Sequence, residues 1–411
     1  MASKVVNRKI SQAVKKNFDE QTQFLANLVR ARSANPFTPD ESKASEPIEK
    51  EVAELIYKKL KSFELRPRMI AANQSRPNVV VFFGPRRFRK SLLFNGHMDT
   101  AVPSKDYTLA PYSGAVRRNK LYGVGAFDMK GSLSAYVYAL KAIIDAGIQL
   151  DGRLIETFVV DEEPGACSRL GTSYVLTKGI RAKVAIVGEP GTGKIAVGHR
   201  GGYRFKLTTF GEAVHTGVSA WEKGEKGKNA ILDMARVINA LQGIEIPYKP
   251  ARAFPGREPV FTFPVKIEGG TAVNMVPERC VAYGDVRLLP GNSDKQVQLM
   301  IKEKLQQLGD IRYELENVLF VPSVETDQKE EIVETLADIA RSVNGKRPVI
   351  EGAGPWNDSW MLIKRDIPTI SGFGPDGDGA HAPDEWVDLN SLRKVTEIYA
   401  KVAVQYLGVR R

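Results

Sequence analysis

The sequence has few of the residues and segments that define several common classes of protein. It contains two cysteines, Cys167 and Cys280, in 411 residues, which is too few for a disulfide scaffold. No apolar run approaches the roughly 20 residues needed to span a bilayer. The N-terminal segment MASKVVNRKISQAVKKNF lacks the apolar run and the cleavage site of a secretory signal. These absences predict a cytoplasmic protein with reduced thiols and no membrane span.

Two interpretations of the N-terminal segment stay open. Residues 1–17 contain no acidic side chain, as in an amphipathic organelle-targeting segment. Ile10, Val14 and Phe18, however, form one helical stripe. The stripe favours an ordinary N-terminal helix.

The positive charge of the chain does not identify a nucleic-acid partner. Lys and Arg number 59 against 48 acidic residues, a net charge of +11. They are scattered along the chain, and the short clusters at 86–90 and 117–120 belong to no recognisable nucleic-acid module. With 43% hydrophobic and 26% charged residues, the composition is that of an ordinary globular protein. We expect no nucleic-acid partner and keep a basic nucleic-acid binder only as a remote alternative.

The apolar pattern predicts an α/β fold with an insert. From Pro47 to about 190, helical stretches alternate with short apolar runs such as LLFNG (92–96) and KVAIVG (183–188), which suggests a layered sheet. From about 195 to 315 the strands alternate with polar residues around two amphipathic helices, which suggests two helices on an antiparallel sheet. We therefore expect a three-layer α/β domain at 1–195 and 316–411, interrupted by an α+β domain at 196–315.

Polar clusters follow the predicted strands where each one ends. They are GHMDT (96–100), DEEPG (161–165), GEPG (188–191) and GPDGDGAHAPDE (374–385). Ligands bind beyond the carboxyl ends of strands in open α/β sheets. AFDMKG (126–131) adds a carboxylate at the start of a helix. The side chains thus brought to one sheet edge are His97, Asp99, Asp128, Glu162, Glu163, Glu189 and His381.

Imidazoles and carboxylates in this combination are suited to divalent metal ions, zinc above all. Each residue also has a simpler explanation: Asp128 alone is more often a helix N-cap than a ligand, and Glu162 and Glu163 alone are more often solvated loop residues. The coincidence of all of them at strand ends, with two of only four histidines, favours the metal site. One histidine per metal with a shared carboxylate suits a pair of ions that activates a water.

The motifs also resemble those of a known family. GHMDTAVP, GVGAFDMKGSLSA, DEEPGA, VGEP and AHAPDE occur in the order found in the acetylornithine deacetylase, succinyl-diaminopimelate desuccinylase, aminoacylase and carboxypeptidase G family of co-catalytic zinc peptidases. The resemblance extends from about residue 20 to the C-terminus. It implies that 1–195 and 316–411 form the catalytic domain and that 196–315 is an inserted dimerisation or lid domain. It implies that His97 binds one zinc with Glu189, that His381 binds the other with Glu163, and that Asp128 bridges the pair.

The same resemblance implies the remaining roles near the metals. Glu162 matches the general base, and Asp99 matches the carboxylate that orients the imidazole of His97. The peptide between Asp128 and Met129 is expected to be cis. Neighbours on an extended segment point in opposite directions, so the carboxylates of Glu162 and Glu163 cannot do the same job without a local turn. We expect Pro164 and Gly165 to supply a break, so that one carboxylate binds metal while the other faces the water.

The insert adds further residues by resemblance. His215 in GEAVHTG matches a histidine that reaches across a dimer to stabilise the oxyanion in the partner's site. Asn274 and Arg287 match positions that hold the substrate's carboxylate, for which the planar guanidinium is suited. The chain departs from the family where GAGPWNDSWM (352–361) replaces a Gly-Thr-Asp-Ala stretch. Trp356 and Trp360 there indicate either a larger apolar substrate or simple aromatic packing.

The sequence therefore predicts a homodimeric metal-dependent amidohydrolase. We expect two divalent ions per subunit, zinc or alternatively cobalt or manganese, and a small N-acyl amino acid or short peptide with a free carboxylate as substrate. A deacetylase or desuccinylase is the leading hypothesis, and an exopeptidase or dipeptidase is the alternative. A non-catalytic binding protein that retains the fold is the alternative from another class. The sequence does not identify the acyl group or the amino-acid side chain.

Overall fold

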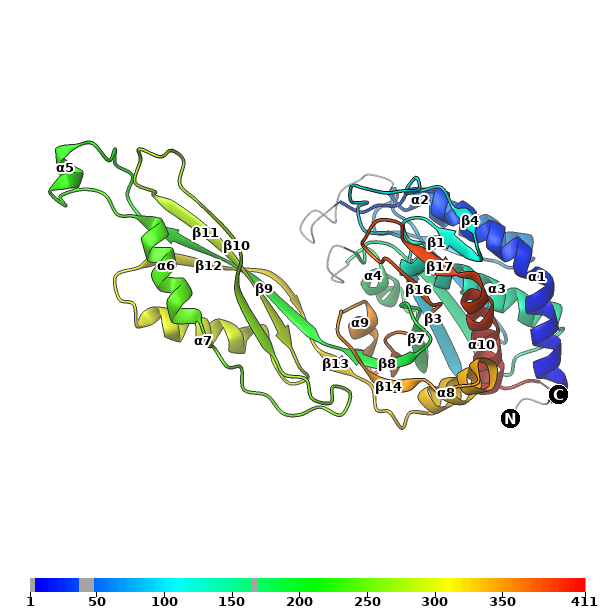
Figure 1. Cartoon of the computed structure of the whole chain (residues 1–411). Helices are drawn as coiled ribbons and strands as arrows, with labels where there is room; N and C mark the ends of the chain where they lie inside the picture. Colours follow the sequence, from blue (N-terminus) through cyan, green and yellow to red (C-terminus); the bar gives the residue numbers. More distant parts are fainter. Residues whose placement is uncertain (1–3, 37–47, 164–168, 411) are drawn as a thin grey trace. The chain divides into compact units, whose positions relative to one another are not determined.

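The computed structural model describes residues 4–36, 48–163 and 169–410, which form two compact units (Figure 1). Unit 1 comprises Met1–His199 and Glu325–Arg411, and unit 2 comprises Arg200–Val324. The insert expected at 196–315 overlaps unit 2. The bounds differ because residues 196–199 lie in a strand of unit 1, while the last strand of unit 2 runs to Val321.

The centre of unit 1 is a six-stranded sheet in the order β1-β2-β6-β3-β7-β15. Its strands are β1 (Arg68–Ile70), β2 (Asn78–Phe83), β6 (Arg153–Val159), β3 (Ser91–His97), β7 (Val184–Val187) and β15 (Thr369–Ile370). The last four in this order are parallel, and β2 and β1 are antiparallel to their neighbours. All residues of β3 and β7 are buried, as predicted for parallel strands covered on both faces.

Helices cover both faces of this sheet. The helices of unit 1 are α1 (Lys4–Arg30), α2 (Lys50–Ser62), the short π-helix η1 (Ala126–Lys130), α3 (Gly131–Asp145), α4 (Thr172–Thr177), α8 (Glu331–Asn344), α9 (Ser359–Ile363) and α10 (Leu389–Leu407). α1, α3 and α10 pack together, with α3 and α10 against β3 (Figure 1). α4 and α9 lie on the other face, where Val175 and Leu362 join a core with Leu93 and Ile155. The predicted three-layer α/β class is confirmed.

Two smaller sheets complete unit 1. One has the order β13-β8-β14, with β13 (Val324–Glu325), β8 (Lys194–His199) and β14 (Val349–Ala353). The other has the order β16-β17-β5-β4, with β16 (Gly377–Asp378), β17 (Trp386–Asp388), β5 (Lys120–Tyr122) and β4 (Ala115–Arg117). The second sheet joins the segment around β5 to the segment that carries His381.

Unit 2 is an antiparallel sheet with two helices on one face (Figure 1). Its strand order is β10-β11-β9-β12, with β10 (Val260–Gly269), β11 (Arg279–Leu288), β9 (Gly201–Phe210) and β12 (Arg312–Val321). The two helices on the sheet are α6 (Ala230–Leu241) and α7 (Asp294–Gln306), and a short helix, α5 (Ser219–Glu222), precedes them. Met234, Val237 and Ile301 are buried in the core between α6, α7 and the sheet, whereas Ile231 is 38% exposed.

Some expectations concern residues outside the described ranges. These are the helix start at Pro47, the break at Pro164 and Gly165, and the thiol of Cys167. The other cysteine, Cys280, is buried as a free thiol. Over the part of the chain that the structure describes, we find no helix both long and apolar enough to cross a membrane.

One buried carboxyl in the main sheet affects stability. Glu156 lies in β6 with no exposed surface, and neither of its carboxylate oxygens has a hydrogen-bond partner among the described residues. Burial therefore raises the pKa of Glu156 well above its usual value of 4.5. A raised pKa in the folded state means that stability is full below pH 4.5 and is lost as the pH rises toward the folded-state pKa.

We expect Glu156→Gln to stabilise the protein at pH 8, because the amide needs no proton to remain neutral. Between the pKa of Glu156 in the unfolded chain and its raised pKa in the folded protein, the free energy of unfolding of the wild type should fall relative to that of the variant. The fall should be up to about 1.4 kcal/mol per pH unit. Urea unfolding followed by circular dichroism at pH 6 and pH 8 measures the difference. Glu314→Gln, at an exposed position of β12, is the control. A gain of equal size at both pH values would contradict this expectation.

Candidate metal centre

Several chain segments of unit 1 converge at one edge of the main sheet. His97 ends β3, Glu162 and Glu163 follow β6, and Glu189 follows β7. These strands are parallel, so their carboxyl ends meet at the same edge. Asp128 lies in η1, immediately before α3, and His381 lies between β16 and β17.

The ligand atoms of these side chains form two groups. In each group one atom from every residue lies within 4.8 Å of the others: His97, Asp128 and Glu189 form the first, and Asp128, Glu163 and His381 the second. Asp128 belongs to both groups. This division is the same as the ligand sets implied by the family resemblance.

Asp128 lies between the two histidines. Its Oδ1 is 3.3 Å from Nε2 of His97, and its Oδ2 is 3.6 Å from Nε2 of His381. Nε2 of His381 is also 3.0 Å from Oε2 of Glu163. The peptide between Asp128 and Met129 is cis, as expected. Each oxygen of Asp128 thus faces one imidazole, which is the arrangement a bridging carboxylate requires.

Two glycines allow α3 to approach the strand ends closely. A Cβ atom on Gly188 would lie 2.4 Å from the hydroxyl of Tyr136, and one on Gly96 would lie 2.7 Å from Cε of Met129. A larger residue at either position would have to displace these side chains. The close approach brings Asp128, at the N-terminal side of α3, beside His97.

Glu385 holds the loop that carries Asp128. Its buried carboxylate accepts hydrogen bonds from the backbone N–H groups of Gly125, Phe127 and Asp128, at 2.8, 2.8 and 2.9 Å. Glu385 is four residues beyond His381, so one segment supplies a candidate ligand and also fixes the loop of another. This role was not predicted from the sequence, although Glu385 ends the motif AHAPDE.

Asp99 is placed differently from the expectation. Nδ1 of His97 lies 2.9 Å from the backbone carbonyl oxygen of Asp99 and 3.7 Å from its carboxylate Oδ1. The carbonyl is therefore the nearer acceptor for the imidazole. The carboxylate instead accepts the backbone N–H groups of Glu162 at 3.2 Å and Glu163 at 3.1 Å.

The electrostatics of the site favour cations. Burial and neighbouring carboxylates raise the pKa of Glu189 to about 8, and burial raises the pKa values of Glu162 and Glu163 above their usual range. Although burial opposes it, the nearby imidazoles of His381 and His97 lower the pKa of Asp128. Oε1 of Glu163 is buried without a hydrogen-bond partner among the described residues. A set of two imidazoles with several buried carboxylates fits two divalent ions, zinc included.

A further buried carboxyl lies close to these groups. Asp358 is 1% exposed, and its Oδ2 accepts a hydrogen bond from the hydroxyl of Thr172 at 2.5 Å. Burial raises its pKa to about 7, and its charge raises the pKa values of Glu162 and Glu189. Trp360, two residues later, packs against the core beneath the sheet, which favours the packing explanation for this tryptophan.

The three candidate residues of the insert lie in unit 2. Nε2 of His215 is 3.1 Å from Nδ2 of Asn274, and both side chains are exposed. Arg287 is near the other end of β11, where its Nε donates to Asp285 at 2.7 Å. His215 and Asn274 are thus brought together, while Arg287 is separated from them by most of a ten-residue strand.

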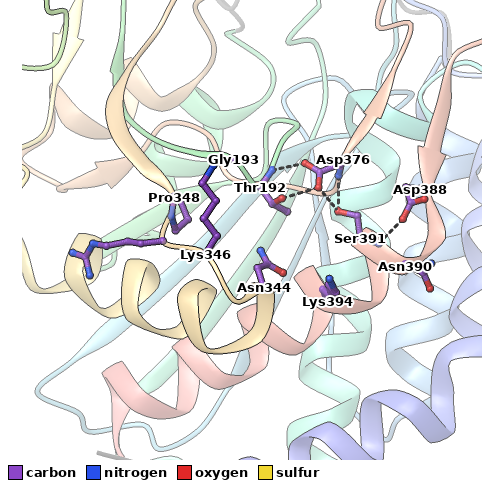
Figure 2. A pocket seen from close by; sticks show the side chains of 11 residues that line it. Thr192, Gly193, Asn344, Lys346, Pro348, Asp376, Asp388, Asn390, Ser391 and Lys394 are labelled. Atoms are coloured by element: carbon purple, nitrogen blue, oxygen red, sulfur yellow. Dashed lines mark hydrogen bonds between the residues drawn. The ribbon is translucent and has the colours of Figure 1, made fainter.

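A hollow of about 320 Å³ in unit 1 is lined by residues that include Lys346, Lys394 and Asp376 but none of the candidate ligands. Figure 2 shows the side chains that line it. Asp376 accepts hydrogen bonds from the amide and the hydroxyl of Thr192, at 2.7 and 2.6 Å. Thr192 follows Glu189 by three residues, so this contact ties the Glu189 loop to the segment that leads to His381.

Comparisons with known proteins identify the family of the chain. The model of Peptidase family M20/M25/M40 matches residues 93–405. A Bacillus subtilis N-formyl-4-amino-5-aminomethyl-2-methylpyrimidine deformylase is 28% identical over 351 residues, 78% of this chain and 80% of that protein. A Rickettsia bellii succinyl-diaminopimelate desuccinylase is 26% identical over 405 residues, 94% of this chain and 97% of that protein. The crystal structure of an M20 family metallo-carboxypeptidase from Sulfolobus solfataricus superimposes with a TM-score of 0.76 at 18% identity, covering 94% of this chain and 99% of that chain.

Proposed function

Because the chain belongs to Peptidase family M20/M25/M40 and is a metal-dependent hydrolase, we propose that it cleaves the amide bond of an N-acyl amino acid. The reaction is of the deacetylase or desuccinylase type, in the cytoplasm. One observation carries the proposal: two groups of ligand atoms share Asp128, and the carboxylate of Glu162 belongs to neither group.

His97, Asp128 and Glu189 would hold one ion, and Asp128, Glu163 and His381 would hold the other. Two bound divalent ions, zinc in our proposal, supply polarisation of the amide carbonyl and a lowered pKa of the attacking water. The donor set of imidazole nitrogen and carboxylate oxygen supports this assignment.

Glu162 is the proposed general base. Its carboxylate takes a proton from the attacking water and later gives it to the leaving amine. Asp99 accepts the amide N–H groups of Glu162 and Glu163, and so keeps the two carboxylates in fixed places. The pKa of Glu162 is raised by burial, which makes it a stronger base once it is ionised.

His215 and Asn274 are proposed to act in the site of a second copy of the chain. Arg279, at the His215 end of β11, is eight residues from Arg287, which corresponds to about 25 Å in a strand. One subunit therefore cannot place both Asn274 and Arg287 on the same carboxylate. In a homodimer, Asn274 and Arg287 can come from different copies of the chain, although a substrate carboxylate must share Arg287 with Asp285.

The surface of unit 2 supports the homodimer. β10 is one of the two edge strands of the sheet, and Val265 and Ile267 on it are 53% and 47% exposed. Leu232 on α6 is 63% exposed. Exposed apolar residues along an edge strand are typical of a surface that pairs with another chain.

Peptide and formamide cleavage are the competing reactions. The relative from Sulfolobus solfataricus is a carboxypeptidase, and the one from Bacillus subtilis is named for a formyl group on an aminomethylpyrimidine. The substrate of that deformylase carries no amino-acid carboxylate, so it would give Arg287 no carboxylate to bind.

A substrate panel separates these reactions. Purified protein supplied with zinc, cobalt or manganese is assayed on acetylornithine, succinyl-diaminopimelate, other acyl amino acids, dipeptides and the formyl-aminomethylpyrimidine. We expect hydrolysis of an acyl amino acid, loss of activity with a chelator and recovery with added metal. Preference for the formamide or for dipeptides would replace the proposed substrate class. Retained metal with no turnover of any compound would support a binding protein.

A further inference from the structure

The chain turns sharply at Asp161, between β6 and the two adjacent glutamates. Asp161 has a φ of +66°, in the left-handed region that residues other than glycine rarely adopt. Aspartate tolerates this region better than most residues, but the conformation still has an energetic cost. Such a conformation persists where the surrounding structure holds it.

The carboxylate of Asp161 is held by two buried side chains. Its Oδ1 is 3.0 Å from a terminal guanidinium nitrogen of Arg76 and 3.1 Å from Nδ2 of Asn35. Arg76 has no exposed surface, and Asp161 is 2% exposed. Charged groups at this depth are stable only when they are paired and hydrogen-bonded.

Arg76 is itself fixed by Glu49, at the start of α2. Nε of Arg76 donates to Oε2 of Glu49 at 2.8 Å, and a second guanidinium nitrogen contacts Oε1. Oε1 of Glu49 also accepts the backbone N–H of Asp161 at 3.2 Å. Asp161 is therefore held both at its amide and at its carboxylate.

Asn35 extends this network to the metal-ligand side of the turn. Its Nδ2 also donates to Oδ2 of Asp99 at 3.0 Å. Asp99 in turn accepts the N–H groups of Glu162 and Glu163. The segment 161–163 is thus fixed on one side by Arg76 with Glu49 and on the other by Asp99.

We propose that Asp161 is a positioning residue for the general base, and that Arg76 and Asn35 hold its carboxylate so that the turn separates Glu162 from Glu163. The proposal rests on the proposed function of these two glutamates. Asp161 touches neither metal nor substrate in this account; it acts through the geometry of the next two residues.

Asp161→Gly tests the role of the carboxylate. Glycine adopts a φ of +66° without cost, so the variant removes the anchor but not the ability to turn. We expect the zinc affinity of the group containing Glu163 and His381 to fall about 10- to 100-fold, as is usual when a supporting residue is lost. Competition with a chromophoric chelator measures this affinity, and zinc binding by the group containing Glu189 should change little.

Turnover gives a second measurement. At saturating zinc, kcat of Asp161→Gly should fall about 10- to 100-fold while KM stays within about threefold, because substrate contacts are untouched. Asp161→Asn keeps an oxygen for Arg76 and Asn35, and should recover most of both losses. Asp366→Gly is the matched control: Asp366 also has a left-handed φ, of +59°, but its side chain is exposed and has no partner within the described ranges. It should leave zinc affinity and kcat unchanged.

Wild-type zinc affinity and kcat in Asp161→Gly would overturn the proposal. Should that variant fail to fold, Arg76→Lys is measured in the same way. Lysine keeps the positive charge but loses the planar guanidinium that contacts Glu49 and Asp161 together. The substitution should weaken the same zinc group, and wild-type values would equally overturn the proposal. A wild type that binds zinc but hydrolyses nothing would defeat the proposed function alone, because the zinc affinities still test the turn.

Discussion

Glu162→Gln should abolish turnover while leaving zinc binding intact. Removing a general base typically costs about 10²- to 10⁴-fold in rate. Glu162 contributes to neither group of ligand atoms, so both groups remain complete in the variant. Glutamine keeps the size of the side chain and cannot accept the proton of the attacking water. The expected result is a kcat at least about 100-fold lower with zinc content unchanged.

The measurement is kcat together with zinc content by mass spectrometry of the purified protein. Glu156→Gln is the matched control, because it makes the same substitution at another buried glutamate, in the strand that precedes the turn. It should leave kcat unchanged. A Glu162→Gln variant with wild-type kcat would assign proton transfer to another group, and one that loses zinc would make Glu162 a ligand.

His215→Ala should lower kcat about 10²- to 10³-fold, the usual loss when one donor to a developing oxyanion is removed. His215 is exposed in unit 2, and its Nε2 faces Asn274. Removing it should therefore leave the fold and the zinc content unchanged. Lys223→Ala, at another exposed position of unit 2, should retain full kcat.

Mixing two inactive variants tests whether His215 acts across a dimer. In a mixed dimer of Glu162→Gln and His215→Ala, one site has both its own Glu162 and a partner's His215. Random reassociation should then restore about a quarter of the wild-type activity, because half the dimers are mixed and each has one complete site. A mixture that stays inactive although subunits exchange, or full activity of an obligate monomer, would contradict the cross-subunit role.

The strand-end ligands were predictable because they follow a general rule of parallel sheets. Buried apolar runs locate β3, β6 and β7, and the rule places whatever follows them at one edge. His97, Glu163 and Glu189 are found in this way. Their division into two groups around Asp128 came from family resemblance, and the observed geometry has the same division.

The supporting residues were not predictable from local pattern. Arg76 and Asn35 lie in loops far from Asp161 in sequence, and neither belongs to a periodic apolar stretch or to one of the quoted motifs. Their contacts depend on how separate loops meet at the sheet edge. The type of a residue also does not say whether its side chain or its backbone will make a given contact. Asp99 was expected to orient His97 through its carboxylate, but its carbonyl oxygen is the nearer acceptor.

Zinc titration of the metal-free protein measures whether one shared carboxylate, Asp128, joins two metal-binding groups. The wild type should bind two zinc ions per chain, and His381→Ala should bind one tightly, through His97 and Glu189. A wild type that binds a single ion, or a His381→Ala variant that binds two with unchanged affinity, would contradict the two-group site.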